Sequence, residues 1–233
     1  MAKFTALAVA VASTLQQVNA QRIDFEAPPD LSTLANKTLF YTWRPRMHVL
    51  PPDGSIGDPC MEYTDPHTGL FHVGYLHNGA AGATTDDLVH YVDVAQDPVF
   101  ITAGGENDPV AVFDGSVIPY GINGSATLLY TSVAYVPIQW TIPYIKGSET
   151  QSLGVFNADG SSVTKLHQGP VIPGPPYVPV NVTGFRDPYV FQSPELDQAL
   201  NSGDGTWYVI ISGGIHGVGP GLFLYKQLNP EFR

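Results

Sequence analysis

Short apolar runs separated by turn-forming residues follow one another along most of the chain. Residues 70–77 alternate, with Phe71, Val73 and Tyr75 on one face, and the turn-forming segment 65–69 precedes them, which predicts a hairpin. Gly, Pro, Asn or Asp bounds the other strand-length apolar runs, which lie at 110–113, 126–135, 189–191, 207–212 and 222–225. The pattern predicts a domain built from many short strands.

Helical periodicity is nearly absent, and residues 195–200 offer one short helix candidate. Many short strands with turn signals at fairly even spacing indicate an all-β domain. A sandwich, a barrel and a propeller all fit this pattern, and the spacing of apolar runs does not choose among them.

Aspartate recurs where strands are expected to start, at Asp58, Asp114 and Asp187, separated by 56 and 73 residues. This spacing suits radial repetition with loop insertions, because a four-stranded propeller blade takes roughly 40–50 residues. The innermost strand of every blade faces the central channel of a propeller. In a propeller, we therefore expect the three carboxylates to share one pocket.

The composition is that of a folded globular protein, with 43% hydrophobic and 11% aromatic residues among 233. The 24 glycines and 21 prolines are scattered between apolar runs, which supports many turns between short strands. The formal net charge of -11 should repel phosphate backbones and anionic lipid. We therefore expect neither nucleic acid nor a membrane as a partner.

The N-terminus has the pattern of a secretory signal peptide. Lys3 precedes the apolar run 4–11, and Val18-Asn19-Ala20 offers a small-x-small cleavage site. We expect a signal peptide at 1–20, an extended N-terminal segment at 21–40 and one domain at 41–233. The mature protein is then secreted and extracellular.

Three glycosylation acceptors agree with a secretory route, at Asn36, Asn123 and Asn181, each followed two residues later by Ser or Thr. The single cysteine, Cys60, excludes an intrachain disulfide, and we interpret it as a small buried side chain. The seven histidines lack the spacing of metal ligands, so we expect no metal and no cofactor.

Asp58 is a candidate for carbohydrate chemistry, because glycoside hydrolysis needs carboxyl groups on both sides of the scissile bond. It stands between Gly57, which permits close approach, and Pro59, which fixes the following backbone. An Asp-Pro pair taken alone is most often a turn. Other segments of the sequence favour a functional role for Asp58 over a simple turn.

Several segments in order carry a family pattern: Trp43-Arg44-Pro45 with His48, Gly57-Asp58-Pro59, residues 82–91, Phe113-Asp114-Gly115-Ser116-Val117 and Phe185-Arg186-Asp187-Pro188. Together they resemble glycoside hydrolase family 32, the family of invertases, inulinases and fructosyltransferases. The likeness extends over residues 36–228 and is greatest to a fungal fructosyltransferase-like branch, which shares the runs at 147–152 and 212–217.

The resemblance implies a five-bladed β-propeller, truncated in this chain to roughly its first three to four blades. It implies Asp58 as the nucleophile that forms a covalent fructosyl-enzyme, and Asp187 as the carboxylate that stabilises the transition state. Arg186 and Asp114 are then sugar contacts. Trp43, Trp140 and Tyr144 are candidate aromatic platforms. The implied substrates are sucrose and fructo-oligosaccharides.

Two departures from the family pattern leave parts of this reading open. The resemblance implies that Gln139 binds substrate on the side that receives the leaving or acceptor sugar. It stands where members of the fungal branch often have histidine, so hydrolysis and fructosyl transfer both remain open. No motif like that of the family's acid/base glutamate precedes Arg233, and neither Glu195 nor Glu231 lies in one. A catalytically inactive carbohydrate-binding fragment is therefore the alternative, and a non-sugar interaction scaffold is a third, weaker one.

Overall fold

A computed structural model of the chain describes residues 56–166, 169–176 and 181–228, together with Ala35, Asn36, Thr38, Thr42 and Val49. The expected signal peptide at 1–20 lies outside the described residues, as does Trp43. The strands among the described residues belong to the compact unit Met47–Arg233. In the described part of the chain, no helix is long and apolar enough to cross a membrane.

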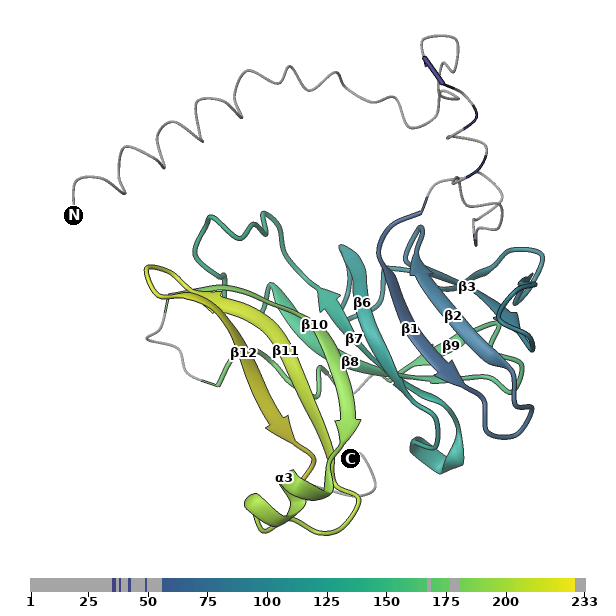
Figure 1. Cartoon of the computed structure of the whole chain (residues 1–233). Coiled ribbons are helices and arrows are strands. Elements are labelled where there is room, and N and C mark those ends of the chain that lie inside the picture. Colours follow the sequence, from purple (N-terminus) through teal and green to yellow (C-terminus); the bar gives the residue numbers. More distant parts are fainter. Residues whose placement is uncertain are drawn as a thin grey trace. The chain divides into compact units, whose positions relative to one another are not determined.

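The described residues form three antiparallel sheets, which confirms the predicted all-β class (Figure 1). The first sheet has the order β1 (Pro59–Thr64), β2 (Phe71–Leu76), β3 (Ala80–Thr85), β4 (Val92–Asp93), and β5 (Val99–Ile101) also pairs with β3. The second has the order β6 (Ala111–Ile118), β7 (Thr127–Val133), β8 (Glu149–Phe156), β9 (Val163–Lys165). The third comprises β10 (Val182–Gln192), β11 (Trp207–Ile215) and β12 (Gly219–Lys226).

The predicted hairpin is present as β1 and β2. Asp65 closes the turn, because its carbonyl accepts the Gly69 amide at 2.8 Å and its amide donates to the Leu70 carbonyl at 2.8 Å. Gly69 has φ +75°, a left-handed conformation that suits glycine. The short helix candidate is also confirmed as α3 (Pro194–Ala199), where the Ser193 hydroxyl caps the Leu196 amide at 3.2 Å.

The apolar runs located the other predicted strands but not all of their bounds. They lie within or overlap β6, β7, β10, β11 and β12, yet β10 begins at Val182, well before the predicted 189. The runs missed β3 and β8, whose sequences AAGATT and ETQSLGVF hold small or polar residues. Except for Thr84, which is partly exposed, these polar side chains are buried and hydrogen-bonded, so the two strands show no alternation of apolar and polar positions.

The two faces of the second sheet pack into two separate hydrophobic clusters. One cluster joins it to the first sheet and includes Cys60, Phe100, Leu128, Tyr130 and Phe156. The other joins it to the third sheet and consists of Leu129, Leu153, Phe185, Val209 and Ile211. Cys60 is 4% exposed, which confirms its prediction as a buried side chain. The second sheet is thus covered on both faces.

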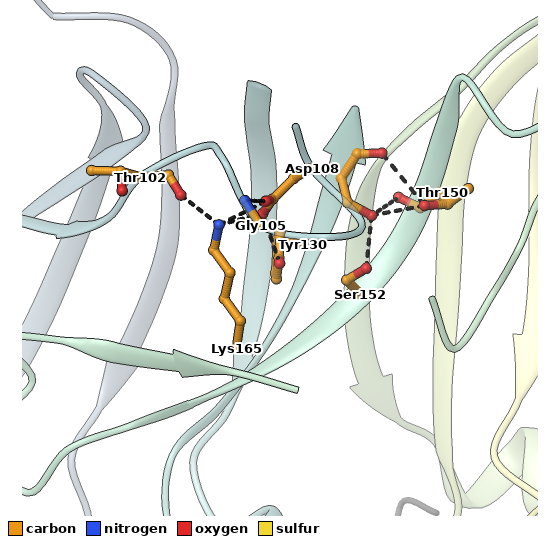
Figure 2. A network of polar contacts seen from close by, with 8 residues as sticks. Thr102, Gly105, Asp108, Tyr130, Thr150, Ser152 and Lys165 are labelled. Carbon is orange, nitrogen blue, oxygen red and sulfur yellow. Dashed lines mark hydrogen bonds and ion pairs between the residues drawn. The ribbon is translucent and has the colours of Figure 1, made fainter. Parts of the chain in front are cut away.

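A polar network also ties the second sheet to the first (Figure 2). Lys165 of β9 donates to the Thr102 carbonyl, beyond β5, and to the Asp108 carboxylate at 2.7 Å. Asp108 is fully buried and also accepts the Tyr130 hydroxyl at 2.9 Å and the Gly105 amide at 2.7 Å. These partners satisfy a buried charge that would otherwise destabilise the fold.

Candidate active site

The first strands of the three sheets lie next to one another, with β6 in contact with both β1 and β10 (Figure 1). Each of these strands brings one of the three aspartates singled out in the sequence. The expectation that all three stand at strand starts was wrong. Asp58 comes just before β1, but Asp114 lies inside β6 and Asp187 inside β10.

Asp114 and Asp187 each lie in a β-bulge of their strand. In β6 the register shifts between Val112 and Gly115, and in β10 it shifts between Arg186 and Tyr189. Two residues of each bulged strand therefore stand opposite one residue of the neighbouring strand, which changes the direction of the side chains. Pro188 is tolerated inside β10 because a bulge does not need its missing N–H. Apolar periodicity gives no signal for a bulge.

Asp58 is exposed and its backbone is fixed by β2. Its carbonyl accepts the Leu76 amide at 2.9 Å, and the Gly57 amide donates to the Leu76 carbonyl at 2.7 Å. A Cβ at Gly57 would lie 2.9 Å from Leu76 Cβ and 3.1 Å from its carbonyl oxygen. The glycine is therefore needed for close contact with the chain, and the carboxylate of Asp58 stays open to solvent.

Asp114 and Asp187 form a half-buried carboxyl pair. Burial, followed by the charge of Asp187, raises the pKa of Asp114 to about 6, and the charge of Asp58 acts in the same direction. Burial also raises the pKa of Asp187, against the opposing effect of Arg186. A side-chain hydrogen bond between the two favours the proton on Asp114. The site can therefore hold one shared proton between neighbouring carboxyls.

Cys60 also contacts this pair, a link that sequence reasoning missed. Its buried thiol interacts with the Asp114 carboxylate in the direction that lowers the pKa of Asp114. Burial, together with the charge of Asp114, raises the pKa of the thiol well above its ordinary value. The thiol is thus protonated and unreactive as a nucleophile.

Arg186 lies between an acid and an aromatic ring. Its Nε forms an ion pair with Glu149 Oε1, and its guanidinium carbon lies 4.2 Å from the centre of the Trp140 ring. Burial raises the pKa of Glu149, and Arg186 acts in the opposite direction. Trp140 also packs on Gly184, where an added Cβ would lie 2.5 Å from its ring. The guanidinium is thus held in place beside Asp187.

Three buried polar side chains to which the sequence analysis assigned no role surround residues 185–187. Glu149 Oε2 accepts the Phe185 amide at 3.1 Å, Gln151 Nε2 donates to the Phe185 carbonyl at 2.9 Å, and Thr131 Oγ1 accepts the Asp187 amide at 3.0 Å. Polar residues at 149 and 151, two apart in a strand, lie on one face. That spacing was the signal from which the sequence could have predicted that Glu149 and Gln151 act together.

The other predicted site residues lie apart from this cluster or outside the described residues. Gln139 is exposed on the loop between β7 and β8, where its carbonyl accepts the Ile142 amide at 3.2 Å. Trp43 is not among the described residues. The glycosylation acceptors Asn36, Asn123 and Asn181 are all exposed. Within the described segments, no three or more His, Cys, Asp or Glu side chains are grouped to hold a metal ion.

An all-β fold that gathers carboxylates beside a guanidinium fits the class of carbohydrate-cleaving proteins. The sequence agrees, since residues 48–229 match the glycosyl hydrolases family 32 N-terminal domain. The chain belongs to glycoside hydrolase family 32.

Solved structures and curated relatives extend the match. A β-fructofuranosidase from Aspergillus kawachii, solved with glycerol, is 65% identical with a TM-score of 0.78, covering 88% of this chain and 34% of its own. A fructosyltransferase from A. japonicus is 53% identical with a TM-score of 0.74, covering 89% and 37%. A sucrose-6-phosphate hydrolase from Escherichia coli is 26% identical over 194 residues, covering 79% and 35%. The chain thus spans about a third of the length of these relatives.

Proposed function

We propose that the chain is the front part of a retaining β-fructofuranosidase or fructosyltransferase that acts on sucrose and short fructo-oligosaccharides. The observation that carries the proposal is the meeting of Asp58, Asp114 and Asp187, brought by the first strands of three adjoining sheets. The names of the similar fungal proteins, a β-fructofuranosidase and a fructosyltransferase, support this substrate class.

The proposed architecture is that of a five-bladed propeller of which this chain supplies the first blades. Each sheet is then one blade, and its first strand lies innermost. The contacts of β6 with β1 and β10 fit this arrangement, because innermost strands of neighbouring blades adjoin around the channel. The carboxylates would thus face the channel.

In the proposed reaction, Asp58 is the nucleophile. An oxygen of its carboxylate attacks the anomeric carbon of the fructosyl unit, a new ester bond forms, and the bond to the leaving sugar oxygen breaks. Water or a sugar hydroxyl then attacks the same carbon and releases Asp58. The exposure of the Asp58 side chain supports this role, because the substrate must reach it.

Asp187 and Arg186 stabilise the fructosyl group. Positive charge develops on the ring in the oxocarbenium-like transition state, and a carboxylate next to it lowers the barrier. The Asp114 carboxyl, which keeps a proton up to a pH of about 6, can donate to Asp187 or to a fructose hydroxyl. The pair therefore supplies both a charge and a hydrogen-bond donor.

Among the described residues, the buried Glu149 and the exposed Glu195 do not suit the acid/base role. Glu149 is buried in its ion pair with Arg186, and Glu195 is exposed on α3, where it accepts the Ser193 hydroxyl at 2.8 Å. We place the acid that protonates the leaving oxygen in a later part of the complete protein. The alternative is that this chain binds fructosyl groups without cleaving them.

We further propose that the protein is secreted and glycosylated. The support is the charged and apolar pattern of residues 1–20 and the exposure of Asn36, Asn123 and Asn181.

Glucose and fructose release from sucrose tests the proposed activity. The measurement compares the 233-residue chain with an extended chain, in which residues 1–233 are joined to the remaining C-terminal part of the A. kawachii β-fructofuranosidase. We expect activity only in the extended chain. Asp58→Asn should lower kcat by about 10⁴-fold or more, because it removes the nucleophile.

Asp204→Asn is the matched control, because Asp204 is exposed on the turn that precedes β11. It should leave the activity unchanged. A folded extended chain that releases no fructose, but binds it, would support the carbohydrate-binding alternative. Full activity of the Asp58→Asn variant would refute the assignment of Asp58.

A further inference from the structure

The backbone of Asp187 has a conformation that a non-glycine residue rarely adopts. Its φ is +60°, in the left-handed region, and it stands in the bulge of β10 immediately before Pro188. Such a conformation is unfavourable by itself and persists where the surrounding structure fixes it. The groups that hold residues 185–187 therefore decide where the Asp187 carboxylate points.

Two hydrogen bonds connect Asp187 to β8 through β7. The Asp187 amide donates to Thr131 Oγ1 at 3.0 Å, and the Thr131 hydroxyl donates to Gln151 Oε1 at 3.0 Å. Thr131 and Gln151 are cross-strand partners, and both are fully buried. Because the hydroxyl has one proton, donation to Gln151 leaves its lone pairs to accept the amide.

Gln151 closes a ring of hydrogen bonds around the motif. Its Nε2 donates to the Phe185 carbonyl at 2.9 Å, while its Oε1 receives the Thr131 hydroxyl. The amide of Gln151 is therefore oriented by both contacts at once. This ring links the carbonyl of residue 185 to the amide of residue 187, on either side of Arg186.

Thr131 also lies opposite the other bulge of the site. The register of β6 with β7 places Val112 opposite Ser132 and Gly115 opposite Tyr130, so Phe113 and Asp114 both face Thr131. One buried residue of β7 therefore adjoins the bulge that carries Asp114 and holds the bulge that carries Asp187. This position suits a residue that sets the geometry of the carboxyl pair.

We propose that Thr131 and Gln151 are positioning residues, which act through Asp187 and hold its carboxylate in the orientation needed for catalysis. The catalytic part of this inference rests on the function proposed above. The structural part, that the Thr131 hydroxyl fixes the Asp187 amide, does not depend on activity.

The test compares Thr131→Val, which keeps the shape and removes the hydroxyl, with Thr131→Ser, which keeps the hydroxyl. Ser132→Ala is the matched control. Ser132 is the next residue of β7 and is equally buried, but its hydroxyl contacts Thr150 and Ser152 at 2.8 and 2.7 Å. Alternation along the strand puts it on the face opposite Thr131.

The first readout is hydrogen exchange of the Asp187 amide in the 233-residue chain. We expect Thr131→Val to speed this exchange by about 10-fold or more, while Ser132→Ala and Thr131→Ser leave it near the parent value. Unchanged exchange in Thr131→Val, or an equal increase in Ser132→Ala, would overturn the inference.

The second readout is kinetics of the extended chain on sucrose. Thr131→Val should lower kcat by about 10- to 100-fold with a smaller change in KM, and Thr131→Ser should restore most of it. Gln151→Met should lower kcat similarly, and the double variant should lose little more, because the two residues act as one unit. If the parent is active and Thr131→Val keeps full kcat, the catalytic part is wrong. An inactive, folded parent refutes the proposed function instead, and the exchange result still decides the structural part.

Discussion

Asp114 is the residue whose ionisation should most clearly affect the stability of this chain. Its pKa in the folded protein is raised from 3.8 to about 6, first by burial and then by the charge of Asp187. Between about pH 4 and pH 6, the Asp114 carboxyl therefore holds its proton in the folded state but has lost it in the unfolded state. The stabilisation is complete below about pH 4 and is lost as the pH rises through about 6.

Asp114→Asn should therefore stabilise the fold near pH 7 and have little effect near pH 4. The expected gain at neutral pH is on the order of 1–2 kcal/mol, after allowance for screening by solvent at a half-exposed group. Thermal unfolding of the two proteins across this range measures it. A stabilisation that grows as the pH falls would contradict the assignment of a raised pKa.

The sequence identified three aspartates but not the way in which they meet. Motifs marked Asp58, Asp114 and Asp187, and radial repetition suggested a common pocket. Thr131, which binds the Asp187 amide, and Gln151, which binds the Phe185 carbonyl, were not identified, because they come from β7 and β8, distant in sequence. The contact exists only once the second and third sheets pack together.

At the scale of the strand, the bulge in β6 depends on a glycine. A Cβ at Gly115 would lie 2.4 Å from the Leu129 carbonyl oxygen and 3.0 Å from Tyr130 Cα, both on the paired strand β7. Neither atom belongs to a flexible side-chain end, so the strands would have to separate. Because Gly115 follows Asp114 directly, that separation would also move the carboxyl group.

Gly115→Ala should thus lower the free energy of unfolding by about 1–3 kcal/mol, the usual cost of overpacking. Gly221→Ala is the control, because Gly221 is also in a strand and a Cβ there meets no atom within 4 Å. It should change stability by about 0.5 kcal/mol or less. Chemical denaturation measures both variants. Equal effects would show that the contact with β7 does not matter.

Element prediction succeeded where strands alternate or are uniformly apolar and failed where buried polar side chains form them. β11 was predicted because its first half is apolar, whereas β8 was missed because its first four residues, Glu149, Thr150, Gln151 and Ser152, are polar. Each of these side chains is buried with a partner across the sheet or on a neighbouring sheet. Sequence periodicity does not record such partners.

At the scale of the whole molecule, the third sheet exposes one apolar face. Tyr189, Ile210 and Leu224 are cross-strand neighbours on that face, and Leu222 lies two residues before Leu224. Tyr189 is 60% exposed, Leu222 64% and Leu224 49%. In the propeller proposed above, a further blade covers this face. In the 233-residue chain, the face is open to other molecules, which favours association.

The 233-residue chain should therefore self-associate through this face, and the paired substitution Leu222→Lys and Leu224→Lys should shift it toward monomer. Leu88→Lys with Val92→Lys is the control, because those side chains are 64% and 68% exposed and belong to the first sheet region. Sedimentation velocity at several concentrations measures the change. If both pairs reduce association equally, net charge and not this face is responsible.

The measurement that tests the central claim most directly is the capture of a fructosyl group on Asp58. The extended chain is mixed with sucrose, quenched in acid within the first turnovers, and digested for mass spectrometry, with Asp58→Asn treated in parallel. The account predicts that the peptide containing Asp58 gains the mass of one fructosyl unit, and that the variant peptide does not. A fructosyl group on a different carboxylate, with Asp58 unmodified, would contradict it.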